Sequence, residues 1–222
     1  MPAAAPVLPP PLRDGDRLTR DEFMRRWEAM PDLKHAELLD GVVYMPSPVT
    51  FSHGFLHLRL GGWLLRYTDA TPGAEASSDS TWLMGPDDAT QPDLTLRIVD
   101  GRQSRVEKNF LSGAPDLVVE VAWSSAARDL GVKSDLYRRH GVREYLVILA
   151  QERDVLWREV VKGRYRKLTP DENGVLRSAV FPGLWLDRDA LWAEDWPRLH
   201  ATLDAGLATP EHAAFVRRLK RR

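Results

Sequence analysis

Apolar and polar positions alternate along the chain in patterns that predict both helices and strands. An apolar stripe follows Thr19, and Thr19 with Glu22 forms a capping box, so a helix is expected to begin there. A second stripe predicts a helix that is capped by Ser52 and runs to about residue 67. Between the two helices, short apolar runs flank Asp40-Gly41, which predicts a β-hairpin.

The most apolar strand is expected at residues 116–122, where Asp-Leu-Val-Val-Glu-Val-Ala is nearly continuous in apolar character. A helix over residues 127–140 and a strand over 144–150 follow it, and this order favours a parallel crossover. Residues 93–99 alternate well enough for another strand. Residues 101–113 are polar and basic, and we expect a loop there.

Weaker patterns complete the prediction. They predict a polar strand over residues 74–83 and a meander of strands over 154–180. Two closing helices are expected over 187–196 and 210–222. The fold class is therefore α/β (α+β by some schemes), with a mixed sheet of about five to seven strands flanked by helices. We expect three parts: a disordered proline-rich tail over 1–15, a domain over 16–200 and a helical basic extension over 201–222.

Composition narrows the class of protein. The chain has 222 residues, of which 43% are hydrophobic and 28% charged, and this balance excludes a wholly disordered chain. The net charge of −1 gives no overall basic field that would attract nucleic acid. The absence of cysteine excludes disulfides, thiolate nucleophiles and cysteine zinc sites. The apolar runs are shorter than the ~20 residues that span a bilayer, and the start is no secretory signal, so we expect a cytoplasmic protein without a membrane partner.

Several acids occupy positions where an ionised group is costly. Glu120 lies inside the most apolar strand, so it requires a cation, a proton or hydrogen bonds. Asp93 opens its strand after a proline, and Glu37 lies on the first hairpin strand. Lys133 lies on the helix after the Glu120 strand, four residues beyond Asp129. Carboxylates with one ammonium suit phosphodiester hydrolysis by Mg²⁺, which prefers oxygen ligands and activates a bound water.

Each of these residues also has a structural alternative. Glu37 can be an exposed strand residue, and Asp93 can cap a turn. Lys133 can be a solvated partner of Asp129. Glu120 is the hardest to explain without a site, although a buried structural acid stays open.

Other residues point less clearly to chemistry. His53 and His57 are four apart on a predicted helix, but no glutamate follows His53, so the zinc-protease pattern fails and no zinc site is expected. Basic residues are frequent over 128–143 and in the loop that holds Arg102, Arg105 and Lys108, which fits a phosphate partner. Solvated helix faces explain the same residues equally well. The sequence has neither a glycine-rich phosphate loop nor a serine nucleophile elbow.

Ordered motifs sharpen this interpretation. They are AELLDGVVYMPSP at 36–48 with His53, QPDL at 91–94, APDLVVEV at 114–121, DLGVKSDLY at 129–137, GVREYLV at 141–147 and PGL at 182–184. Over about residues 19–195 the chain resembles a large bacterial family of restriction endonucleases, the Uma-two type, within the PD-(D/E)XK nuclease superfamily. The resemblance implies a restriction-endonuclease-like core.

The resemblance also implies roles. Asp93 looks like the aspartate of the PD motif and Glu120 like the acid of the (D/E)XK motif, and both are expected to hold Mg²⁺, with Mn²⁺ as a substitute. The usual lysine position holds Ala122, and Lys133 matches the lysine that the family places on the next helix. Glu37 is similar to an acid from an early element. The turn over residues 122–126 reads AWSSA where the family usually has Leu-Ser-Pro-Ser-Thr.

Together these expectations describe an endonuclease that hydrolyses DNA phosphodiester bonds with a Mg²⁺-activated water and the catalytic set Glu37, Asp93, Glu120 and Lys133. One alternative is a weak or inactive nuclease-fold module that binds DNA or protein. Another is hydrolysis of RNA or a different phosphate ester at the same site. Nucleases of this superfamily often act as dimers in which each protomer cuts one strand, so a homodimer is among the expected assemblies.

Overall fold

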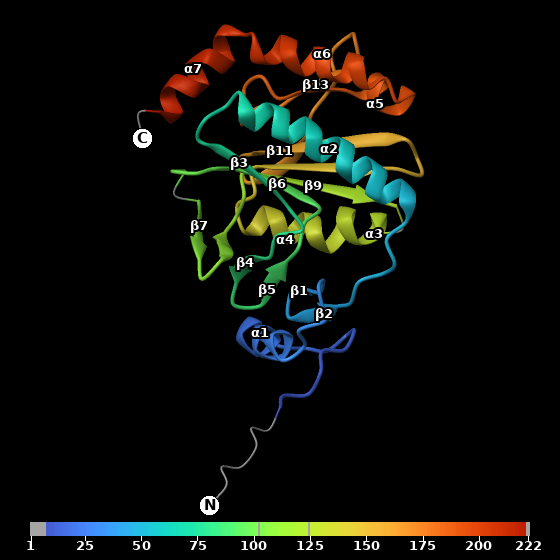
Figure 1. The fold of residues 1–222 in the computed structure, drawn as a ribbon, viewed down its shortest axis with the longest axis vertical. Coiled ribbons are helices and arrows are strands. Elements are labelled where there is room, and N and C mark those ends of the chain that lie inside the picture. Colours follow the sequence, from blue (N-terminus) through green and yellow to red (C-terminus); the bar gives the residue numbers. More distant parts are fainter. Residues whose placement is uncertain (1–7, 102, 124, 221–222) are drawn as a thin grey trace, which may run out of the picture.

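Two six-stranded sheets and a surrounding set of helices build the molecule (Figure 1). The structure is a computed structural model that describes residues 8–101, 103–123 and 125–220. The central sheet consists, in spatial order, of β12 (Arg164–Lys167), β11 (Asp154–Val161), β10 (Glu144–Leu149), β9 (Leu117–Ala122), β6 (Leu94–Ile98) and β3 (Ala74–Ser78). The accessory sheet consists of β2 (Val42–Tyr44), β1 (Glu37–Leu39), β5 (Asp88–Thr90), β4 (Trp82–Gly85), β8 (Phe110–Gly113) and β7 (Ser104–Glu107). Both sheets are mixed, which confirms the predicted fold class.

Helices lie on both sides of the central sheet. They are α2 (Phe51–Asp69), α3 (Ala126–Arg128), α4 (Ser134–Arg139), α5 (Arg188–Ala193), α6 (Trp196–Leu207) and α7 (Pro210–Leu219). Helix α1 (Arg20–Glu28) instead packs on the accessory sheet, where Phe23 joins Leu38 and Val43. A π-helical segment, η1 (Asp129–Lys133), joins α3 to α4. A small hairpin of β13 (Val175–Arg177) and β14 (Trp185–Asp187) connects the central sheet to α5. Among the described residues, no helix combines the length and apolar character that a bilayer crossing requires.

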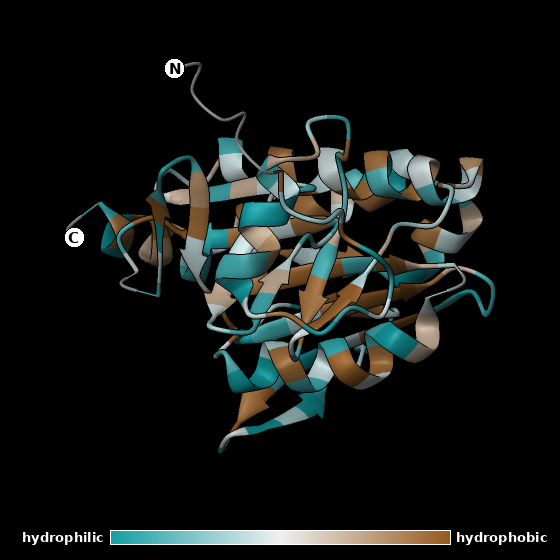
Figure 2. Cartoon of the chain, turned by 90° about the horizontal axis from the view of Figure 1, so that it is seen from below, coloured by the Kyte–Doolittle hydropathy of each residue, from teal (hydrophilic) through white to brown (hydrophobic). Residues whose placement is uncertain are grey.

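Strand β9 separates two hydrophobic clusters. Leu117, Val119 and Val121 pack with α2 and the C-terminal helices on one face. Val118 and Ala122 pack with α4 on the other face. Apolar residues accordingly concentrate along the central strands in Figure 2. Because alternate side chains share a face, Glu120 lies on the same side of β9 as Val118 and Ala122, which is the side that faces α4.

The crossover predicted around β9 is confirmed, because β9 and β10 are parallel and α3, η1 and α4 connect them. The first helix and hairpin are also confirmed: Thr19 Oγ1 accepts a hydrogen bond from the Glu22 N–H, and Asp40 and Gly41 both have positive φ between β1 and β2. The predicted N-cap of α2 is wrong. Thr50 caps this helix, because its Oγ1 accepts from the His53 N–H, and Ser52 lies inside the first turn.

The prediction of a loop at residues 101–113 is also wrong. Lys108 and Asn109 adopt left-handed φ values of 49° and 68°, which close a hairpin of β7 and β8. Strand β7 is an edge strand with largely exposed side chains, so it lacks the apolar alternation that reveals a strand. The polar strand expected at 74–83 divides at Asp79 into β3 and β4, which belong to different sheets.

The C-terminal part departs from the predicted meander. Strands β11 and β12 pair as expected, but β13 pairs with β14. Asp171 Oδ1 accepts hydrogen bonds from the N–H groups of Asn173 and Val175, and this turn redirects the chain. The domain boundary expected at residue 200 falls inside α6, whose Leu199 and Leu203 belong to the main core.

Candidate active site

A cavity of about 270 Å³ opens where β1, β6, β9, α2 and η1 approach one another. Its lining includes all four residues that the sequence nominates, Glu37, Asp93, Glu120 and Lys133, together with Asp129. Glu37 lies on β1 of the accessory sheet, Glu120 on β9 of the central sheet and Asp93 directly before β6. Residues far apart in the sequence therefore converge at the junction of the two sheets.

Lys133 lies at the centre of the acidic residues. Its Nζ is 3.0 Å from Glu37 Oε2, 3.0 Å from Glu120 Oε1 and 3.8 Å from Asp129 Oδ1. Lys133 follows Asp129 by four residues in the π-helical segment, so both share a face, and both are buried; the backbone at Gly131 between them is non-helical. The usual superfamily position holds Ala122, which is packed in the apolar cluster beside α4. Lys133 is thus the ammonium that reaches Glu120.

Hydrogen bonds fix the carboxylates. Glu120 Oε1 accepts from the Tyr137 hydroxyl at 2.8 Å in addition to Lys133. Glu37 Oε1 accepts from the Gln91 N–H at 2.9 Å. Asp93 Oδ2 accepts from the Val121 N–H at 2.6 Å, which ties the start of β6 to β9. The donors hold each side chain in one orientation before any ligand binds.

Burial and mutual repulsion set the protonation of the acidic residues around Lys133. Burial raises the pKa of Glu120 well above its usual range, and the attraction of Lys133 opposes this only in part. Burial would lower the pKa of Lys133, but the charges of Glu120, Glu37 and Asp129 outweigh it and raise that pKa. Burial also raises the pKa of Asp129. Several acids therefore compete for one buried ammonium.

The donor set fits Mg²⁺ or Mn²⁺. Four carboxylates, from Glu37, Asp93, Glu120 and Asp129, line one cavity beside a single lysine, so negative charge is in excess. All of these donors are hard oxygens, which both ions prefer. A bound dication would offset the repulsion that raises the pKa of Glu120.

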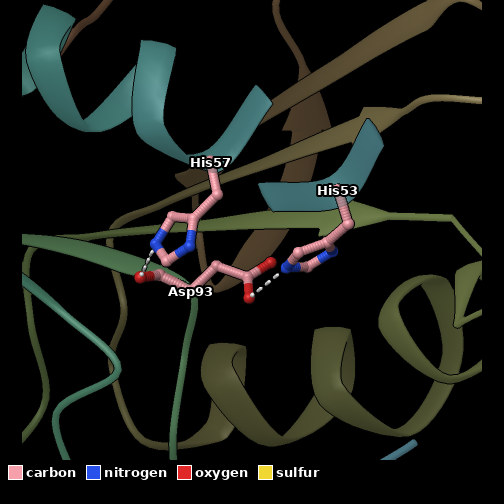
Figure 3. Close-up of side chains that lie close together, drawn as sticks. All are labelled: His53, His57 and Asp93. Carbon is pink, nitrogen blue, oxygen red and sulfur yellow. Dashed lines mark hydrogen bonds and ion pairs between the residues drawn. The ribbon is translucent and has the colours of Figure 1, made fainter. Parts of the chain in front are cut away.

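Two histidines of α2 lie beside Asp93, and the sequence did not identify them as part of the site; His53 lines the cavity. His53 Nε2 lies 3.3 Å from Asp93 Oδ1, and its Nδ1 lies 3.0 Å from the Val121 carbonyl oxygen (Figure 3). His57 Nε2 lies 2.8 Å from the Asp93 carbonyl oxygen. A hydrogen bond that the Asp93 carboxylate accepts from His53 raises the pKa of His53 despite partial burial. Burial would raise the pKa of Asp93, but His53, the Val121 N–H and Lys133 together outweigh this effect and lower that pKa.

Most of the basic residues in the predicted stretch serve other roles. Arg139 pairs with Asp40, and Arg143 lies 3.3 Å from Asp116. Arg128 differs, because it lines the cavity and its guanidinium carbon lies 4.6 Å from the centre of the Tyr44 ring. Arg102 lies outside the described residues.

Comparison with known proteins finds a matching family model and similar solved structures. A family model, Uma2, described as "Putative restriction endonuclease", matches residues 20–189. The chain is also similar to a crystal structure described as a putative nuclease belonging to DUF820 from Anabaena variabilis ATCC 29413. The TM-score is 0.64 at 18% identity, over 81% of this chain and 98% of that one. This likeness shows the fold. No curated protein matches the chain.

Proposed function

The chain belongs to the Uma2 family of restriction endonucleases, and from this premise we propose that it is a Mg²⁺-dependent endonuclease that hydrolyses DNA phosphodiester bonds. The observation that carries the proposal is the position of Lys133 Nζ, 3.0 Å from carboxylates of two different sheets, in a cavity that also contains Asp93. An ammonium among converging acids, open to ligand, is the arrangement that metal-assisted phosphoryl transfer requires.

In this proposal Asp93 and Glu120 hold the dication, and Glu37 positions Lys133. When bound, Mg²⁺ supplies a water of lowered pKa and polarises the phosphoryl oxygen. Lys133 carries a proton at Nζ and stabilises negative charge that develops on the phosphate. Tyr137 donates to Glu120 Oε1 and so leaves Oε2 as the oxygen available to a ligand. The Val121 N–H similarly orients the Asp93 carboxylate.

Two conservative variants test the assignment. Asp93→Asn and Glu120→Gln are expected to abolish both Mg²⁺ binding, measured by calorimetry, and cleavage of a supercoiled plasmid, while the circular dichroism spectrum stays unchanged. Glu159→Gln is a matched control, because Glu159 pairs with Arg166 on the other side of the central sheet. Full activity in either site variant would refute the assignment.

The same experiment separates the rival function. A wild-type protein that binds DNA but neither binds Mg²⁺ nor cleaves would favour a nuclease-fold module that recognises DNA or protein without cutting. Cleavage of RNA in preference to DNA would retain the site and change the substrate. A chelator is expected to stop cleavage, and Mn²⁺ is expected to restore it.

A further inference from the structure

His53 and His57 lie four residues apart on α2, so one face of the helix presents both imidazoles. This face points at Asp93 from the side opposite η1 (Figure 3). One ligand atom from each of His53, His57 and Asp93 lies within 4.8 Å of the others. Both imidazoles are about four-fifths buried, with side-chain exposures of 21% and 18%.

Hydrogen bonds to backbone carbonyls fix the orientation of both rings. A carbonyl oxygen only accepts, so the Nδ1 of His53 donates to Val121 and the Nε2 of His57 donates to Asp93. In the neutral rings, the remaining nitrogens are Nε2 of His53 and Nδ1 of His57, and each keeps its lone pair. Figure 3 shows both of these nitrogens on the side of the Asp93 carboxylate. Histidines that bind metals typically have this arrangement, because the outer hydrogen bond selects the tautomer.

We propose that His53, His57 and Asp93 form a site for a first-row transition dication of the Co²⁺, Ni²⁺ or Zn²⁺ type. Imidazole nitrogen favours these ions over Mg²⁺, which binds oxygen ligands. Metal–ligand bonds of about 2.0–2.2 Å require the three atoms to lie closer together than they do now. Water completes the coordination. Asp79 Oδ2 lies 3.9 Å from His57 Nε2, the nitrogen that donates to the Asp93 carbonyl oxygen, and is therefore not one of the proposed ligands.

This site is distinct from the Mg²⁺ position proposed above, although both use Asp93. Its two nitrogen donors come from α2, whereas Glu37, Glu120 and Lys133 come from β1, β9 and η1. The inference therefore does not require nuclease activity, and it stands on the geometry of α2 and Asp93. The rival explanation is an ion pair between protonated His53 and Asp93, with His57 serving only to hold the backbone.

The test uses the full-length protein stripped of metal by a chelator and then dialysed. Calorimetry and the visible absorption of Co²⁺ report binding, and the absorption bands distinguish nitrogen from all-oxygen ligation. Wild type is expected to bind Co²⁺ more tightly than Mg²⁺. His57→Gln is expected to weaken Co²⁺ binding by about tenfold or more and to shift the bands. His35→Gln is the matched control, because His35 lines the same cavity outside the trio.

Three further measurements keep the outcome decisive. His53→Gln is expected to reproduce the loss of Co²⁺ binding, and thermal melting checks that both variants fold. Glu120→Gln is expected to lose Mg²⁺ binding and yet retain the Co²⁺ bands, so a failure of the proposed nuclease function is distinguishable from a failure of this site. Co²⁺ binding that is unchanged in His57→Gln, or a wild type that prefers Mg²⁺, would overturn the inference.

Discussion

Lys133 Nζ lies 3.0 Å from Glu120 Oε1, and both residues are about 95% buried. The two side chains come from β9 and η1, both part of the crossover that leads from β9 to β10, so this connection also brings the charges together. Since Glu37 and Asp129 are also near Lys133, one ammonium serves three carboxylates. The stability of the protein is therefore coupled to the charge of its candidate site.

Replacement of this lysine is expected to destabilise the fold. Lys133→Met leaves buried carboxylates without their cation, so the free energy of unfolding should fall by about 3–5 kcal/mol at pH 8. Urea denaturation in the presence of a chelator measures it. The loss should shrink as the pH falls, because the acids then bind protons and no longer repel one another. Lys167→Met, at an exposed position on β12, is the control, and equal stability of the two variants would contradict the argument.

Glu120→Gln is expected to have the opposite effect on the metal-free protein. The pKa of Glu120 is raised in the fold, so its contribution to stability is present below its ordinary pKa and is lost as the pH rises through the folded value. At pH 8 the amide removes this loss, and Lys133 keeps Glu37 as a partner. We expect a gain of about 1–2 kcal/mol, measured by denaturation with chelator. A lower melting temperature for the variant would show that the carboxylate stabilises the metal-free fold.

The sequence was sufficient to nominate the members of this cluster but not the cluster itself. A period of two places Glu120 on one face of β9, and family motifs point to Asp93 and Lys133. Helical spacing places Lys133 on the same face as Asp129, but it indicates neither the non-helical backbone at Gly131 nor the contact of Lys133 with Glu37. The histidines were missed because their role depends on Asp93, 36 residues beyond His57, and the i, i+4 spacing is shared by many ordinary helices.

In the fold as well, features that depend on neighbouring residues were predicted, and features that depend on distant residues were not. The hairpin at Asp40-Gly41 and the strand at β9 follow from turn chemistry and apolar character, which are local. Edge strand β7 is polar and β3 and β4 lie in different sheets, so their pairing depends on distant partners. A pattern of side chains along one strand does not specify which strand will lie beside it.

Glu144 makes the stability of the fold depend on pH at a position far from the candidate active site. It is fully buried at the start of β10, and burial raises its pKa to about 7 even though it accepts hydrogen bonds from Ser178, Ala179 and Val180. A raised acid pKa means that stability is lost as the pH rises from about 4.5 to about 7. The difference of about 2.5 pKa units corresponds to at most about 3 kcal/mol.

Glu144→Gln should therefore flatten this part of the stability profile. The amide oxygen still accepts from the backbone N–H groups, and its NH₂ donates to Ser178 Oγ, so the variant should match wild type at pH 4.5 and exceed it at pH 8. Guanidinium denaturation at a series of pH values measures the difference. Exposed Glu152→Gln is expected to follow the wild-type curve throughout. If Glu144→Gln also follows it, the carboxyl group titrates normally in the fold.

Arg128 is expected to contact the phosphate backbone of a bound nucleic acid. It lines the cavity at α3, and its stacking on Tyr44 holds the guanidinium near the opening without an acidic partner among the described residues. One lost phosphate contact should weaken DNA binding uniformly across sequences by a few-fold and reduce the slope of log K against log salt by about one.

Fluorescence anisotropy of labelled DNA with Arg128→Gln, in chelator and over a range of NaCl concentrations, measures both the affinity and the salt slope. Arg177→Gln is the matched control, because Arg177 stacks on Trp185 outside the lining of the cavity. Loss of a cation that contacts phosphate reduces the number of counterions released on binding, and so reduces the salt slope. An unchanged slope for Arg128→Gln would therefore mean that the DNA backbone does not contact Arg128.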